Sequence, residues 1–207
     1  MTTEHFTLQG ARAATITEAT SRATIFLGAM SAGMVALGLI ATATRVGTVF
    51  YTFGLILLST LSFIGFVTFD RVLQCGIEDL RYAQRIERLR SYYFEAAPEL
   101  TAYLATAPPR QRLVLQGLHG GYGQVFRTVA GMIGVVTAVL TGSAAGLLAA
   151  LASGHSAVAG FATGGAVGMA VLAALMWFQY RAWGVAGQQQ PFGHEEGEPQ
   201  EGDKRLF

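Results

Sequence analysis

Four long stretches that lack Asp, Glu, Lys, Arg and His constrain the fold of this chain more than any other feature. They cover residues 23–44, 48–69, 128–153 and 156–180. A helix of about 20 apolar residues crosses the roughly 30 Å hydrocarbon core of a bilayer, and each stretch is that long. Because lipid cannot pair with exposed backbone groups, such stretches cross as helices. The sequence therefore predicts an all-α, polytopic membrane protein surrounded by a lipid bilayer.

Short connections pair the four stretches into two transmembrane hairpins. Residues 45–47 separate the first two stretches, and Gly154-His155 separates the last two. A capping-box spacing over Thr15-Ile16-Thr17-Glu18 predicts where the first helix begins. We expect a flexible N-terminus (1–14), a first hairpin (15–69), a cytoplasmic helical segment (70–127), a second hairpin (128–183) and a disordered acidic tail (184–207). A signal peptide with a small-residue cleavage site at 41–43 is the weaker alternative, because Glu4 and Glu18 precede it.

Arginine is concentrated between the two hairpins. Eight arginines lie within residues 70–127, whereas the two opposite connections contain only Arg45. Cytoplasmic loops of membrane proteins carry an excess of Lys and Arg. We therefore predict that the middle segment and both termini are cytoplasmic.

The middle segment begins with a charged stretch that favours a helix and has no proline before Pro98. Two apolar seams run along it, one at Leu73, Ile77 and Leu80, the other at Tyr82, Ile86, Leu89 and Tyr93. A third set of residues, spaced i, i+4, i+7 and i+11, shares one face and consists of Arg81, Arg85, Arg88 and Tyr92. Guanidinium forks match phosphate geometry. We predict that this arginine face, just below the inner membrane surface, binds an anionic lipid or another phosphate-bearing ligand. The alternative is a face that is only solvated or screened by anionic headgroups.

Small residues recur at every fourth position in the last two apolar stretches. The predicted packing residues are Gly134, Ala138, Gly142 and Gly146 in the third stretch, and Gly160, Gly164 and Gly168 in the fourth. In lipid, such stripes let two helix backbones approach closely. A tight antiparallel hairpin is the simplest interpretation, and a glycine-lined subunit interface or pore wall is the alternative.

Several classes of function lose support from what the chain lacks. Ion-coupled transporters usually keep an ionisable residue near the membrane midplane, and the four stretches contain no charged or histidine residue. Hydrolase motifs are absent, and the glycine cluster at 120–123 lacks a Walker lysine. The single Cys75 excludes an intrachain disulfide, and a net charge of +1 gives no reason to expect nucleic acid. We predict no catalytic residue, cofactor or metal, and that the protein is not an enzyme. Hydroxyl groups such as those of Thr52 and Thr137 can line a pore, but more often they bond to their own helix.

The run Arg85–Tyr93, followed by Pro98-Glu99, resembles a run in uncharacterised integral membrane proteins of actinobacteria. The resemblance covers about forty residues, and the two-plus-two arrangement of spans agrees with it. More distantly, two hydrophobic pairs joined by a cytoplasmic helix resemble the small transmembrane effectors of bacterial nucleotide-signalled defence, although this chain has no recognisable sensor domain. The resemblance implies a bacterial inner membrane location and, for the effectors, perforation of that membrane.

Three functions agree with these features. The first is a self-associating membrane protein, a pore, channel or effector, whose arginine face senses an anion or lipid. The second is a structural or scaffold subunit that binds a protein partner through residues 70–127. The third is a carrier or enzyme acting on lipid at the inner leaflet, which has the least support.

Overall fold

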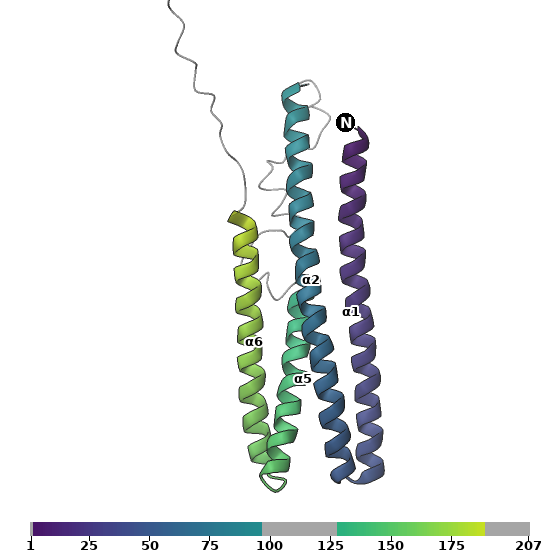
Figure 1. Cartoon of the computed structure of the whole chain (residues 1–207), viewed down its shortest axis with the longest axis vertical. Coiled ribbons are helices and arrows are strands. Elements are labelled where there is room, and N and C mark those ends of the chain that lie inside the picture. The colour runs from purple at the N-terminus through teal and green to yellow at the C-terminus, as the bar shows by residue number, and fades with distance from the viewer. Residues whose placement is uncertain (1, 97–127, 189–207) are drawn as a thin grey trace, which may run out of the picture.

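The computed structural model describes residues 2–96 and 128–188, and every element within those ranges is a helix. The helices are α1 (Thr2–Thr44), α2 (Thr48–Ala96), α5 (Val129–Ala152) and α6 (Ala157–Gln188) (Figure 1). All four are long and apolar enough to cross a membrane. The predicted all-α class with two helical hairpins is confirmed, and the fold is compatible with an integral membrane protein. The part of the predicted helical segment within 97–127, with its glycine cluster at 120–123, and the tail from 189 onward lie outside the described residues.

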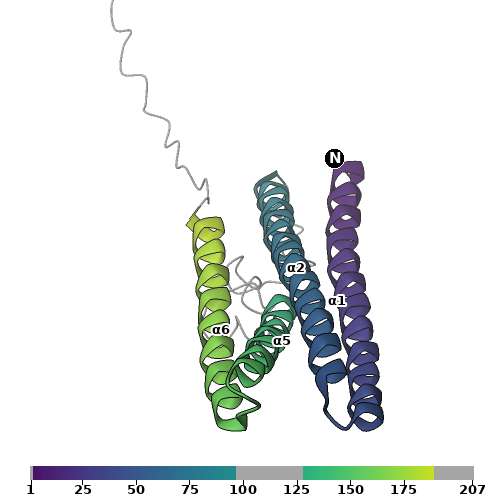
Figure 2. The same cartoon turned by 60° about the horizontal axis from the view of Figure 1, so that its bottom comes forward.

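The four helices stand side by side in chain order rather than around a common centre (Figures 1 and 2). α1 packs along α2, α2 along α5, and α5 along α6, whereas α1 and α5, and α2 and α6, touch at only a few residues. The outer helices α1 and α6 each have one long packing partner. The described helices therefore form an open row, not a closed four-helix bundle.

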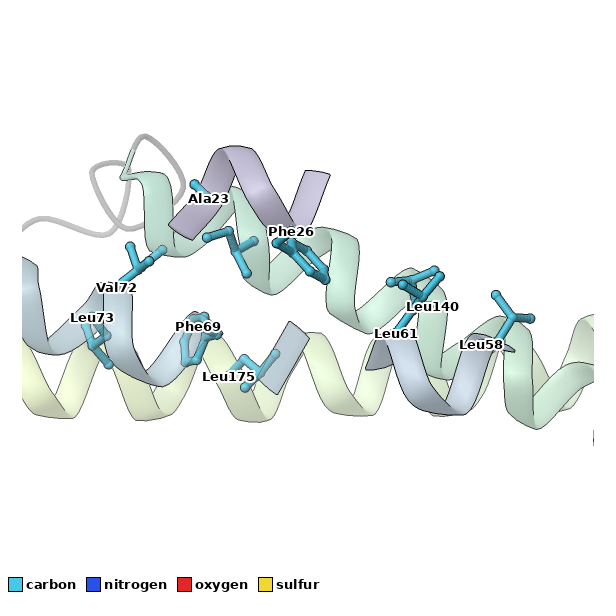
Figure 3. Close-up of a cluster of buried hydrophobic side chains, with 11 residues drawn as sticks. Ala23, Phe26, Leu58, Leu61, Phe69, Val72, Leu73, Leu140 and Leu175 are labelled. Atoms are coloured by element: carbon cyan, nitrogen blue, oxygen red, sulfur yellow. The ribbon is translucent and has the colours of Figure 1, made fainter. Parts of the chain in front are cut away.

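Large apolar side chains fill the junction between α1, α2 and α5 (Figure 3). Phe26 of α1, Phe69 of α2 and Ile133 of α5 are almost completely buried there, and Leu175 brings α6 into the same cluster. A close approach of α2 and α5 lies beside this core, because a Cβ on Gly65 would collide with the fully buried Thr137. A glycine at position 65 thus allows the two hairpins to pack on each other.

Both hairpin turns lie at the same end of the molecule and are tight (Figure 1). Arg45 and Val46 have φ values of 48° and 58°, and Gly154 and His155 have 71° and 73°. These values lie in the left-handed region, which non-glycine residues seldom adopt. Arg45, Val46 and His155 adopt it because each turn must reverse the chain within a few residues. The ring of Tyr51 at the start of α2 packs edge-on against His155, with centroids 5.1 Å apart. This contact joins the two hairpins at their turns.

The first two helices are much longer than a bilayer needs. α1 has 43 residues and α2 has 49, which at about 1.5 Å per residue is more than twice the roughly 30 Å hydrocarbon core. The uncharged parts, 23–44 and 48–69, are sufficient for the crossing. We call the remaining antiparallel pair, residues 2–22 of α1 and 70–96 of α2, the stalk.

Two sequence-based boundaries differ from the structure. Residues 2–14, expected to be flexible, form the first turns of α1, so Thr15 lies within the helix and does not begin it. The physical reason is tertiary, since these turns pack along the second half of α2. At the other end, α6 continues through Gln188, beyond the expected start of the tail at 184.

Candidate functional site

The stalk is held together by an apolar seam on α2. Leu80, Ala83 and Ile86 are buried, and Leu73 and Ile77, one to two turns earlier, belong to or pack on the core. Both predicted seams contribute to this packing, because Tyr82 and Leu89 are half-buried beside Ile86. The side chain of Tyr93 lies outside the described set.

Ion pairs join the two stalk helices just beyond the uncharged spans. Glu18 of α1 accepts hydrogen bonds from Arg71 of α2 and from Arg22, each at 3.0 Å from Nε. About two helical turns beyond Arg71 on α2, Asp79 accepts a hydrogen bond at Oδ1 from Nε of Arg12 at 2.7 Å. Glu18 and Arg22 are spaced i, i+4 on one helix, whereas the two pairs between helices join residues far apart in the sequence.

These ion pairs shift the protonation of Glu18. Its carboxylate lies outside the uncharged span 23–44, and its pKa is lowered first by the hydrogen bond from Arg71 and then by the one from Arg22. The same contact raises the pKa of Arg71, chiefly through the hydrogen bond to Glu18. The Glu18 cluster is therefore ionised at neutral pH and links α1 to α2 as charged groups.

The arginine face lies on the outer part of the stalk. Arg81, Arg85 and Arg88 are exposed on one side of α2, and Tyr92, 53% exposed, extends the same side. A continuous helix carries all four residues, so their shared face follows from the helix period. Among the residues that the structure describes, these four side chains are exposed.

The register between α2 and α5 shows where this face lies relative to the other helices. A Cβ on Gly134 would lie 3.2 Å from Phe69, and Gly54 faces Leu147. Continuing this antiparallel register along two straight helices, Val129 at the start of α5 lies level with roughly residues 72–74 of α2. The arginine face therefore lies beyond the start of α5 along the course of α2.

The α5–α6 hairpin is built on backbone contact between glycines. A Cβ on Gly142 would lie 2.6 Å from the carbonyl oxygen of Gly164, and one on Gly146 would lie 2.8 Å from that of Gly160. The remaining small residues predicted from the stripes border the same contacts: Gly168 faces the carbonyl of Ala138, and Gly134 faces Met176 and Phe69. The glycine stripes thus lie between α5 and α6 of one chain.

Gln179 is a buried polar residue that the sequence analysis missed. It is fully buried on α6, and its Nε2 donates to Oγ1 of Thr128 at 2.8 Å. Thr128 also caps α5, because its hydroxyl accepts from the backbone N–H of Gly131. A glutamine within an otherwise apolar stretch was the available signal, and its hydrogen bond joins α6 to the start of α5.

Most threonine hydroxyls in the spans bond to their own helix. Thr52, Thr60, Thr68, Thr137 and Thr141 each donate to the carbonyl four residues earlier, at 2.7–3.0 Å. The expectation that these groups satisfy themselves locally is confirmed for these five. Such hydroxyls give no sign of a polar pathway within one copy of the described helices.

Aromatic residues surround the end of the fourth span. Trp177 and Phe178 are exposed, and the guanidinium of Arg181 lies 4.8 Å from the centre of the Trp177 ring. Tryptophan and arginine at the end of an apolar helix are typical of the membrane–water interface. Arg181 follows directly on the uncharged stretch of α6, and the nearby Trp183 packs against Gly76 of α2.

Within residues 2–96 and 128–188 no group of three or more His, Cys, Asp or Glu side chains is placed to hold a metal. Comparison with protein-family models, curated proteins and solved structures finds no match. The fold alone therefore defines the class, a chain with four membrane-spanning-capable helices, compatible with a multi-pass membrane protein.

Proposed function

We propose that the protein self-associates in a bacterial inner membrane to form a pore-type or channel-type assembly. In this proposal the stalk is cytoplasmic, and its arginine face senses a phosphate-bearing anion. The observation that carries it is the open row of helices, in which α1 and α6 each have a single long packing partner. The concentration of arginine between the hairpins supports the orientation.

The open row bears on how a pathway could form. In a row, the described helices surround no interior of their own, so a path for ions would be lined by helices from more than one copy. The outer helices present apolar surface along their length, including Ile25, Val35 and Leu39 on α1 and Phe161 and Met169 on α6. Without contacts between copies this surface would face lipid.

The mass of the purified protein in nanodiscs or mild detergent tests self-association. Native mass spectrometry should show multiples of the 21.9 kDa chain at protein concentrations where random co-capture is negligible. Ion flux through liposomes containing the protein should then appear at the loading at which the oligomer appears. A monomer at all loadings would contradict the proposal, and an oligomer without flux would limit it to assembly.

A scaffold subunit is the second candidate, and exposed apolar residues on the stalk favour it. Phe6 is 71% and Ile16 51% exposed on the part of α1 that lies beyond the uncharged span. A partner protein could cover them together with the 70–127 segment. Cross-linking of the full chain in cells, compared with a Phe6→Ser and Ile16→Ser double variant, should capture a partner only with the native residues if this function holds.

A further inference from the structure

We infer that the ligand of the arginine face is a water-soluble anion with two or more phosphate groups, not the headgroup of a membrane lipid. The inference rests on the proposed sensing role of Arg81, Arg85 and Arg88 and specifies its ligand class. Two observations carry it: the height of the face above the membrane and the spread of the three guanidinium groups.

Height separates the face from the headgroups. The second uncharged span ends at Phe69, and α2 continues without interruption to Ala96. At about 1.5 Å per residue, the Cα atoms of Arg81 and Arg88 stand about 18 and 28 Å beyond Phe69 along the helix. The headgroup layer is only about 5–8 Å thick on each side of the hydrocarbon. Arg88 is thus separated from the headgroups by more than two Debye lengths of about 8 Å at physiological salt.

The spacing of the face suits a ligand with several phosphates. Arg81 and Arg88 are separated by about 10 Å along the helix axis, with Arg85 between them. One phosphate can be held by the forks of neighbouring arginines, but occupying all three calls for phosphate groups distributed along the ligand. Tyr92 continues the face by one more turn with an exposed ring, on which a flat base could stack. A nucleoside polyphosphate combines both features.

Titration of the full chain in nanodiscs tests the inference. In neutral phosphatidylcholine discs, calorimetry with inorganic triphosphate should give saturable binding that is at least tenfold tighter than binding of orthophosphate. Arg88→Gln and Arg85→Lys should each weaken triphosphate binding about tenfold, since one removes the charge and the other the fork. Tyr92→Leu should weaken ATP binding but leave triphosphate binding unchanged.

Arg181→Gln provides the matched control, because this exposed arginine lies at the interface level on α6. It should leave triphosphate binding unchanged. Equal affinity for orthophosphate and triphosphate would overturn the inference while keeping anion sensing. If phosphatidylglycerol discs stabilise the wild-type protein but not Arg85→Lys, and triphosphate does not bind, the face binds lipid. If no anion has an effect that Arg85→Lys changes, the face has no sensing role. The oligomer mass would be unaffected by any of these results.

Discussion

Arg12 and Asp79 lie 67 positions apart in the chain, yet Nε of the arginine is 2.7 Å from a carboxylate oxygen of the aspartate. Their side chains are only 24% and 14% exposed. The pair fastens the N-terminal turns of α1 to α2 beyond the uncharged spans. Together with the Glu18–Arg71 pair, it ties α1 to α2 along the stalk that carries the arginine face.

Removing this pair should loosen the stalk without disturbing the spans. We expect Asp79→Asn to lower the free energy of opening of residues 2–22 by about 1–2 kcal/mol, as for a partly buried charged hydrogen bond. Hydrogen exchange measured by mass spectrometry would show this as faster exchange in that segment and unchanged exchange in α5. The double variant with Arg12→Gln should cost little more than either single change. Full additivity of the two changes would mean that the two residues do not interact.

Local spacing made the spans and the α5–α6 contact predictable. The length of the uncharged stretches defined the four helices, and the period of four placed Gly142 and Gly164 on facing sides of a short hairpin. Both features depend on residues close together in the sequence. The structure adds only that the stripes meet within one chain.

The stalk could not be predicted in the same way, because its stabilising contacts join distant residues. Residues 2–14 have little apolar periodicity, and their helix depends on Asp79 and on the seam at Leu80 and Ile86. The arginine face was recognised from its period of 3.6. Its position beyond the start of α5 was not, since that position follows from the uninterrupted course of α2 and its register with α5.

The glycine contact makes a sharp prediction with a neighbouring control. Gly164→Leu should destabilise the α5–α6 hairpin by about 1–3 kcal/mol, the usual cost of overpacking, because a Cβ there would lie 2.8 Å from the carbonyl oxygen of Gly142. Gly165→Leu changes the adjacent residue in the same way but meets open space. Thermal unfolding in detergent should separate the two variants. If both melt alike, the backbone contact between the helices is not present in solution.

Acidification should weaken the Glu18 link between the helices. Its pKa is lowered in the folded protein by hydrogen bonds from Arg71 and Arg22, so the pair stabilises the stalk at pH values above the pKa of an unfolded glutamate. That stability is lost as the pH falls through the lower, folded pKa. We expect wild type to melt above Glu18→Gln at pH 7, the difference to shrink once the pH falls below the ordinary glutamate pKa of about 4.3, and the two curves to converge only below the lowered, folded pKa. A difference that stays constant with pH would show that the side chain acts by packing and not by charge.

Orientation can be read from two engineered cysteines at opposite ends of α2 and the native one between them. Arg45 is exposed in the α1–α2 turn, Arg85 is exposed on the stalk, and Cys75 is buried. With the stalk cytoplasmic, a membrane-impermeant maleimide should modify Arg45→Cys in intact cells and Arg85→Cys only after the membrane is permeabilised. The native Cys75 should stay unmodified in the folded protein on both sides, and so serves as the internal control. Modification of Arg85→Cys but not Arg45→Cys in intact cells would place the stalk outside. A cytoplasmic phosphate-bearing ligand would then have no access to the arginine face, and the sensing proposal would fall together with the orientation.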